Sequence, residues 1–236
     1  MAHEWHRRLE ARQLTFAVLA FVAVAIGGLV LLIPPCFLQG TITPLPGVKP
    51  YTALELEGRD IYVREGCYTC HSQMIRTYRW EAQRYGAPSR PEDSQFDHPF
   101  QWGSKRTGPD LAREGTNSGK QATWHYQHMV DPRKISEGSN MPGYAWLADT
   151  NVDTRWTRSK LYAMQKIGVH YTNAEVDQAE FAYKAQAERI AGDLQAQGVK
   201  VDPKSEMVAL IGYLQRLGRP RDPADGEVKV TQGPTP

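Results

Sequence analysis

The sequence predicts a mainly α-helical protein, in which one N-terminal membrane-spanning helix precedes a helical domain with long loops. Three observations predict this fold class. Residues 13–48 contain no charged side chain, and residues 14–33 are almost continuously apolar. Downstream segments repeat apolar residues three and four apart, as amphipathic helices do. No segment alternates apolar and polar residues in the manner of a half-buried strand, and no internal repeat is present.

The composition suits a folded chain of one or two domains. Of the 236 residues, 41% are hydrophobic and 23% are charged, which is enough apolar material for a buried core. The formal charge of +2 arises within residues 1–50, where four basic residues oppose two acidic ones. Residues 51–236 are therefore neutral overall, which excludes a general nucleic-acid-binding protein. Three cysteines are too few for a disulfide scaffold in a chain of this length.

Residues 13–35 are predicted to form a transmembrane anchor. Twenty residues at about 1.5 Å per residue span the hydrocarbon core of a bilayer, about 30 Å. A cleaved signal peptide would usually have a shorter apolar region, and Pro35 disfavours lipid modification of Cys36. Three arginines precede the span and only Lys49 follows it closely. The positive-inside rule therefore predicts that residues 1–12 are cytoplasmic and that the domain lies outside.

A Pro-rich spacer at residues 36–51 and a series of helices are predicted after the anchor. Thr52 and Glu55 form a capping box, which predicts a helix over residues 53–65 that ends at Gly66. Further helices are predicted at residues 123–130, 155–167 and 172–198, and a last one that begins with Asp202 as N-cap and Pro203 in its first turn. Residues 76–109 show little periodicity and are predicted to form a long loop, and residues 219–236 a flexible tail.

Two of the predicted helices carry an apolar face. The first face consists of Val176, Ala179, Tyr183, Ala187, Ile190 and Leu194, and the second of Met207, Leu210, Ile211, Leu214 and Leu217. Such faces predict burial against other helices. We expect the first to pack within its own domain, and contact with a partner protein is the alternative.

The motif Cys67-Tyr68-Thr69-Cys70-His71 follows directly on the helix predicted at residues 53–65. This spacing is the attachment signal of c-type haem. The two thiols lie on one side of a single turn and reach the haem vinyl groups, while the adjacent imidazole is directed at the iron. A structural zinc site would need a second Cys/His pair, which the sequence lacks. A thiol–disulfide centre would be expected among alternating strands and helices, which are not predicted.

The second axial ligand of the iron must come from elsewhere in the chain. The candidates are Met74, Met129, Met141, Met164, Met207, His98, His125, His128 and His170. Met74 lies too close to His71 in sequence to reach the opposite haem face, and Met164 and Met207 belong to apolar helix faces. Met141 lies in a loop braced by Pro142 and Gly143, which favours it as the ligand. A histidine ligand stays the alternative.

Several segments resemble the membrane-anchored monohaem cytochrome c subunit of cbb3-type cytochrome c oxidases, the CcoO/FixO family. Residues 58–62 and 66–76 are similar to the family's haem-binding segment, residues 97–111 to a second signature, and residues 141–147 to its ligand loop. The resemblance covers roughly residues 10–218. It implies a cytochrome c-like haem domain with additional helices at residues 52–218.

The resemblance also implies the site residues. Cys67 and Cys70 would form thioether bonds to one haem c, and His71 and Met141 would be its axial ligands. The carbonyl of Pro109 would accept a hydrogen bond from the proximal histidine. Ser104 would lie near a calcium ion at a subunit interface, although one hydroxyl does not define such a site.

The function implied by the resemblance is that of a non-catalytic electron-transfer subunit in aerobic respiration. It would pass electrons from a soluble donor cytochrome c, or from a dihaem cytochrome c subunit, to a haem–copper subunit that reduces oxygen. It would lie in the bacterial inner membrane, with the N-terminus cytoplasmic and the haem domain periplasmic.

Three alternatives remain: a free-standing anchored carrier, the small subunit of a nitric oxide reductase, and a gas-sensing haem protein. The aromatic residues Tyr78, Trp80, Tyr85, Phe96, Phe100 and Trp102 bear on this choice. A free carrier has little need of such a cluster, whereas a contact with a large membrane subunit would bury it. A core role for these aromatics is the alternative.

Overall fold

The computed structural model describes residues 2–37, 48–103, 105–117 and 120–218. The chain divides into two compact units, Met1–Thr43 and Pro44–Pro236. The first unit contains helix α1 (Ala2–Glu10) and helix α2 (Gln13–Phe37). Within α2, Gln13–Pro34 has a mean hydropathy of 2.9 and none of its apolar window is buried. This helix is long and apolar enough to cross a membrane, as predicted.

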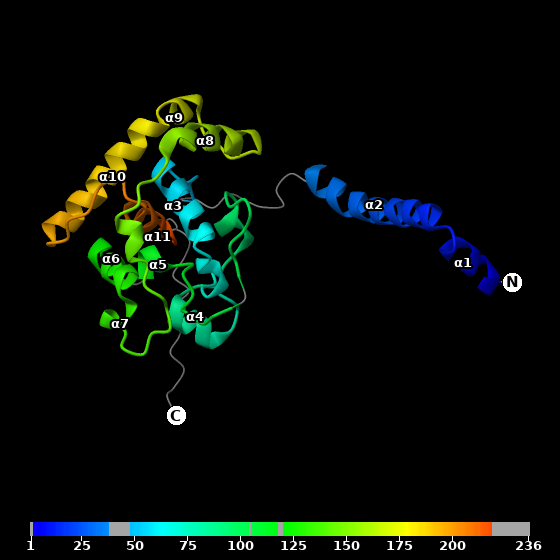
Figure 1. Ribbon diagram of the computed structural model, residues 1–236, viewed down its shortest axis with the longest axis horizontal. Helices are drawn as coiled ribbons and strands as arrows, with labels where there is room; N and C mark the ends of the chain where they lie inside the picture. Colours follow the sequence, from blue (N-terminus) through cyan, green and yellow to red (C-terminus); the bar gives the residue numbers. More distant parts are fainter. Residues whose placement is uncertain (1, 38–47, 104, 118–119, 219–236) are drawn as a thin grey trace. The chain divides into compact units, whose positions relative to one another are not determined.

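The second unit is helical (Figure 1). Its helices are α3 (Ala53–Arg64), α4 (Arg79–Tyr85), α5 (Glu114–Asn117), α6 (Ala122–Val130), α7 (Pro132–Ile135), α8 (Thr157–Lys166), α9 (Asn173–Asp177), α10 (Ala179–Ala196) and α11 (Glu206–Arg216). Four short 3₁₀ turns accompany them: η1 (Cys67–Thr69), η2 (Pro91–Ser94), η3 (Ala145–Ala148) and η4 (Thr154–Trp156). The described residues contain no strand, only one isolated bridge between Asn151 and Ser205. The predicted mainly α-helical fold class is confirmed.

Helices α3 and α11 pack against each other at the centre of this unit (Figure 1). The predicted capping box is present, because Thr52 Oγ1 accepts from the Glu55 N–H and Glu55 accepts from the Thr52 N–H. Gly58 allows the close approach, since a Cβ there would lie 2.0 Å from the Ala209 carbonyl oxygen. Both predicted apolar faces are buried, including Tyr183 and Leu210. The first face therefore packs within its own domain.

The prediction of a single helix over residues 172–198 is wrong in one respect, because the segment forms two helices. Gln178, with a ψ of 10°, separates α9 from α10. Helix α9 packs on α8, whereas α10 also crosses α3, α6 and α11. The turn at Gln178 lets α10 continue past α8 to α3, α6 and α11 while α9 stays on α8, which amphipathic spacing alone does not reveal.

The predicted start of the last helix is also wrong. Ser205, not Asp202, is the N-cap, and its hydroxyl accepts from the Val208 N–H. Asp202 instead accepts from the backbone N–H of Lys204 at 2.8 Å and closes a turn. The Glu206 N–H donates to the Thr150 carbonyl at 2.8 Å, so a tertiary contact fixes where the helix begins.

The other predicted elements agree with the structure except for the exact ends of helices and for short helices that were not predicted. The helix predicted at residues 155–167 begins as η4 and continues as α8, and Gly168 follows with a φ of +104°. The long loop at residues 76–109 contains α4 and η2, which are too short to show a period. Most of the predicted spacer (residues 38–47) and the predicted tail (219–236) lie outside the described residues.

Candidate haem site

The two cysteines and the histidine of the motif lie on one turn after α3. Gly66, with a φ of +71°, ends the helix in the left-handed region that suits glycine. The 3₁₀ turn η1 follows, and the His71 N–H donates to the Cys67 carbonyl at 2.9 Å. Cys67 is half-buried and Cys70 is exposed, and neither forms a disulfide. Burial raises the pKa of the Cys67 thiol to about 12, assisted by the charge of Glu65.

A cavity of about 730 Å³ opens beside this turn. Its wall includes Cys67, Cys70, His71, Pro109 and Met141. A smaller cavity of about 50 Å³ shares several of these residues and continues to apolar side chains of the core, among them Leu111, Met129, Leu210 and Leu214. The motif and the Met141 loop, some 70 residues apart in sequence, therefore line the same cavities.

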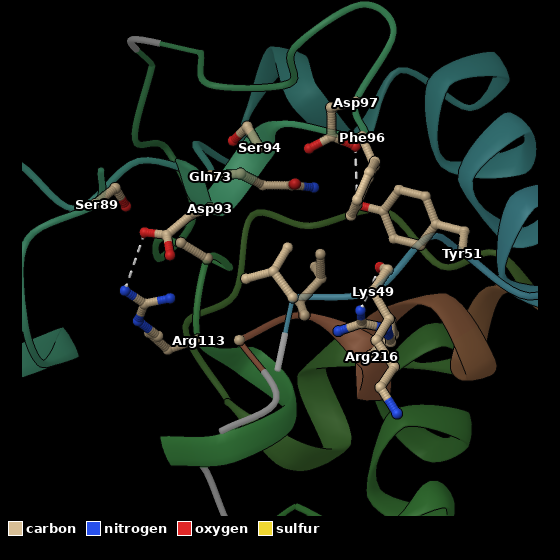
Figure 2. A pocket seen from close by; sticks show the side chains of 14 residues that line it. Lys49, Tyr51, Gln73, Ser89, Asp93, Ser94, Phe96, Asp97, Arg113 and Arg216 are labelled. Atoms are coloured by element: carbon tan, nitrogen blue, oxygen red, sulfur yellow. Dashed lines mark hydrogen bonds and ion pairs between the residues drawn. The ribbon is translucent and has the colours of Figure 1, made fainter. Parts of the chain in front are cut away.

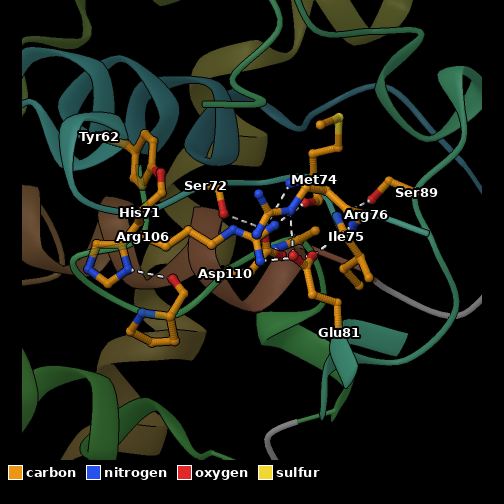
Figure 3. Close-up of polar contacts among 12 residues, drawn as sticks. Tyr62, His71, Ser72, Met74, Ile75, Arg76, Glu81, Ser89, Arg106 and Asp110 are labelled. Carbon is orange, nitrogen blue, oxygen red and sulfur yellow. Dashed lines mark hydrogen bonds and ion pairs between the residues drawn. The ribbon is translucent and has the colours of Figure 1, made fainter. Parts of the chain in front are cut away.

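His71 is held in a defined orientation. Its Nδ1 lies 2.8 Å from the carbonyl oxygen of Pro109 (Figure 3). Burial lowers the pKa of His71, although the Pro109 carbonyl opposes this shift. A neutral imidazole that donates from Nδ1 keeps the lone pair of Nε2 for a metal. Gly108 packs directly on the ring, since a Cβ there would lie 2.3 Å from His71 Cε1.

Pairing between residues 70–76 and 105–111 brings Pro109 to His71. The Gly108 N–H donates to the Cys70 carbonyl at 3.0 Å, and the Leu111 N–H to the Ser72 carbonyl at 2.8 Å. Asp110 accepts from the Ser72 hydroxyl at 2.7 Å and from the Met74 N–H at 2.9 Å (Figure 3). The contacts of Asp110 hold together residues that lie 36 to 38 positions apart in the chain.

A buried ion pair supports this pairing. Glu81, on α4, is fully buried and pairs with Arg76 and with Arg106, the latter at 2.8 Å (Figure 3). Arg106 also donates to the Met74 carbonyl at 2.7 Å. Burial alone would raise the pKa of Glu81, but the donors from Arg76 and Arg106 lower it. Sequence reasoning missed these residues, because a charged residue in a short helix carries no sign of burial.

The loop that carries Met141 is pinned to the C-terminal end of α6. The Tyr144 N–H donates to the Met129 carbonyl at 2.6 Å, and the Met141 N–H to Ser139 Oγ at 3.2 Å. A Cβ on Gly143 would lie 2.7 Å from the Val130 carbonyl oxygen, so only glycine fits against this helix end. Met141 is thus carried by a constrained loop.

The cavity walls reduce the set of candidate axial ligands. Met129, Met141, His125 and His128 line one or both cavities together with His71. The remaining candidates, Met74, Met164, Met207, His98 and His170, line neither. Figure 3 shows the Met74 side chain directed away from His71. Met207 is fully buried in the core, as predicted.

A third cavity, of about 70 Å³ and with a more polar lining, contains none of the motif residues (Figure 2). At its edge, buried Asp97 accepts from the Tyr51 hydroxyl at 2.8 Å and pairs with Arg59 Nε at 3.3 Å. Asp93 pairs with Arg113 at 3.3 Å. Burial raises the pKa of Asp97 in spite of Arg59. These contacts anchor the long loop on α3 and on the segment before α5.

Ser104, the residue implied to lie near calcium, is outside the described residues. Within the described part of the chain, no group of three or more His, Cys, Asp or Glu side chains is placed to hold a metal ion. The calcium ion stays a prediction.

Four of the six aromatic residues in the long loop are exposed. They are Tyr78, Trp80, Phe100 and Trp102, with exposed fractions of 57%, 53%, 48% and 37%. Phe100 and Trp102 stack on each other with ring centroids 4.8 Å apart, and Arg76 lies over the rings of Tyr78 and Trp80. These side chains do not form the core of the domain, which leaves them available for a contact.

The residues around the cavity fit a c-type haem. Two thiols and an oriented imidazole lie on one wall, a methionine loop contributes to the same space, and the inner wall is apolar. Buried polar atoms also lack a partner there: within the described part of the chain, His125 Nε2 and His128 Nδ1 have none. These features suit a large, mostly apolar group with a metal at its centre and a few polar substituents.

Comparison with known proteins agrees with this chemistry. A search of curated proteins finds no match. The family described as "Cytochrome C oxidase, mono-heme subunit/FixO" matches residues 6–220, nearly the whole chain. The chain therefore belongs to the FixO family, the mono-haem electron-transfer subunits of cbb3-type cytochrome c oxidase.

Proposed function

We propose that Cys67 and Cys70 attach the haem of this subunit and that His71 Nε2 and Met141 Sδ are its axial ligands. The observation that carries this proposal is the cavity of about 730 Å³ that all four residues line. His125 and His128 are the competing distal ligands, and Met129 is a further one. Met141 is favoured because it lines both cavities from a loop held at Tyr144.

When bound, the haem supplies one-electron reduction and oxidation at its iron. The chain's own contribution is to keep the ligands still. Pro109 fixes the plane and tautomer of His71, and Gly108 leaves room for the ring. The pairing of residues 70–76 with 105–111 and the pinned Met141 loop restrain both sides. Such restraint suits electron transfer, because ligands that move little keep the reorganisation energy small when the iron is oxidised or reduced.

We infer that electrons enter from a soluble donor cytochrome c or from a dihaem cytochrome c subunit, and leave to the haem–copper subunit. Membership of the oxidase family supports this direction over a free carrier or a nitric oxide reductase subunit. The exposed aromatics Tyr78, Trp80, Phe100 and Trp102 are the proposed contact with the haem–copper subunit. Interface cores are enriched in such side chains.

The proposed topology places α2 across the inner membrane, with residues 1–12 in the cytoplasm and the haem domain in the periplasm. The length and hydropathy of Gln13–Pro34 support the anchor, and the arginines before it support the orientation. Protease added to spheroplasts should release a haem-bearing fragment that begins in the spacer. Full protection would contradict the orientation.

The ligand proposal is tested by Met141→His in the purified full-length protein. The variant should keep its haem on a denaturing gel, lose the methionine–iron absorption band and have a lower reduction potential, because imidazole favours the ferric state more than a thioether does. Met129→Leu and Met164→Leu are the matched controls and should keep the band. An unchanged band in Met141→His, or its loss in Met129→Leu, would reassign the ligand.

A further inference from the structure

Helix α6 forms one wall of the haem cavity and places polar side chains there. His125 and His128 lie three residues apart on this helix, and both line the smaller cavity with His71 and Met141. Trp124 stacks on His128, with ring centroids 4.7 Å apart, and the Lys120 ammonium lies 4.1 Å from the centroid of the Trp124 ring. Nothing in the proposed electron-transfer role uses these side chains.

His125 is the most constrained of them. It is 1% exposed, and across the described residues its Nε2 has no hydrogen-bond partner. A buried polar atom without a partner costs about 1–3 kcal/mol, so such atoms are rare in a finished protein. The cavity that His125 lines is bordered by apolar side chains such as Met129, Leu210 and Leu214, and its polar lining residues, Glu114 and His128 among them, make no hydrogen bond to Nε2. A group that fills the cavity can supply the missing partner.

The other ring nitrogen of His125 is not committed to a hydrogen bond. Nδ1 lies 3.9 Å from Glu114 Oε1, which is beyond hydrogen-bond length. The same carboxylate oxygen accepts from Lys120 Nζ at 2.7 Å. Burial, assisted by the charges of Lys120 and His128, lowers the pKa of His125 to about 4. The ring is thus neutral near pH 7 and carries one proton, which Nε2 is free to hold.

We propose that His125 donates a hydrogen bond from Nε2 to a propionate carboxylate of the haem. The inference rests on the proposed position of the haem in this cavity. A haem c linked through its vinyl groups and ligated at its iron has only its two propionates left as polar groups. A buried N–H donor matches a carboxylate, because hydrogen bonds to a charged acceptor are stronger than those to a neutral one. His125 is then a cofactor-positioning residue, outside the iron's ligand set.

Two variants test the proposal in the full-length, haem-loaded protein. His125→Leu removes the donor, whereas His125→Gln places an amide N–H close to where Nε2 lies. In resonance Raman spectra, the propionate bending mode should shift to lower frequency in His125→Leu and return towards the wild-type position in His125→Gln. His170→Leu, an exposed histidine outside both cavities, is the matched control and should leave the mode unchanged.

Nitrogen-15 NMR of the reduced wild-type protein, labelled at histidine, gives a test that does not depend on His125→Leu. The Nε2 of His125 should have the chemical shift of a protonated nitrogen, with its signal assigned by its loss in His125→Gln. An unprotonated Nε2 would overturn the proposal, as would an unshifted propionate mode in a haem-loaded His125→Leu protein. If His125→Leu holds no haem, the NMR result decides.

The two proposals fail in different ways. A wild-type protein without the methionine–iron band, together with a change to a high-spin haem in His125→Leu, would make His125 an axial ligand, and this would overturn the ligand assignment as well. A retained band with an unshifted propionate mode would overturn only the role of His125. Neither outcome depends on oxidase activity.

Discussion

Replacing Gly108 with alanine tests the proximal side of the site most directly. A Cβ at this position would lie 2.3 Å from His71 Cε1 and 2.7 Å from both ring nitrogens. Ordinary contacts of this kind begin at 3.4 Å, so the ring and the backbone must separate by about 1.1 Å. The backbone has little freedom, because the Gly108 N–H is bonded to the Cys70 carbonyl at 3.0 Å. The imidazole must therefore absorb much of the shift.

That movement would stretch the 2.8 Å contact between His71 Nδ1 and the Pro109 carbonyl and tilt Nε2 away from the iron. Overpacking of this kind costs about 1–3 kcal/mol. We expect Gly108→Ala to keep its haem on a denaturing gel, since Cys67 and Cys70 are untouched. Its ferrous absorption spectrum should become partly high-spin, and carbon monoxide should bind to a fraction of the protein.

The matched control is Gly192→Ala, a helical position where an added Cβ meets nothing within 4 Å. It should leave the spectrum unchanged and raise stability by about 0.5–1 kcal/mol, because alanine is the better helix former. A Gly108→Ala protein with a wild-type low-spin spectrum, no carbon monoxide binding and wild-type stability would refute the reasoning about His71.

Three further predictions concern the distal loop, the buried ion pair and the partner surface. Gly143→Ala should displace the Met141 loop from α6, so the methionine–iron band should weaken while the haem stays attached, as absorption spectra and a haem-stained gel will show. Glu81→Gln should lower the free energy of unfolding at pH 7 by about 3 kcal/mol, because it removes the buried carboxylate that pairs with Arg76 and Arg106. Since the pKa of Glu81 is lowered by folding, the wild-type contribution is present above the usual glutamate pKa of about 4.3 and is lost as pH falls through the lower folded pKa. Thermal unfolding in detergent over this pH range should therefore show a flatter acid limb in Glu81→Gln, with the exposed Glu180→Gln as control; equal acid limbs would contradict the assignment. Trp80→Ser should weaken association with the haem–copper subunit by about 2 kcal/mol, roughly thirty-fold, with haem attachment intact; undiminished co-purification would place the contact elsewhere.

Local patterns in the sequence were sufficient for much of the fold. The length of the uncharged apolar segment identified α2, and the capping box at Thr52 identified the start of α3. Both signals depend on neighbouring residues only. The same local reasoning failed at Gln178 and at Ser205. At Ser205 a contact between Glu206 and Thr150 fixes where the helix begins, and at Gln178 the chain turns between two helices that pack against different sets of helices.

The haem-binding motif is likewise a local signal, since Cys67, Cys70 and His71 share a single turn. What only the tertiary structure decided is which distant residues meet that turn. Pro109 lies 38 residues from His71, and it reaches the imidazole through backbone pairing that Glu81 supports from a third segment. His125 becomes a candidate for binding the haem only because packing leaves its Nε2 buried and without a partner among the described residues. A sequence specifies local conformation through short-range sterics and hydrogen bonds, whereas burial and long-range pairing depend on how the whole chain packs.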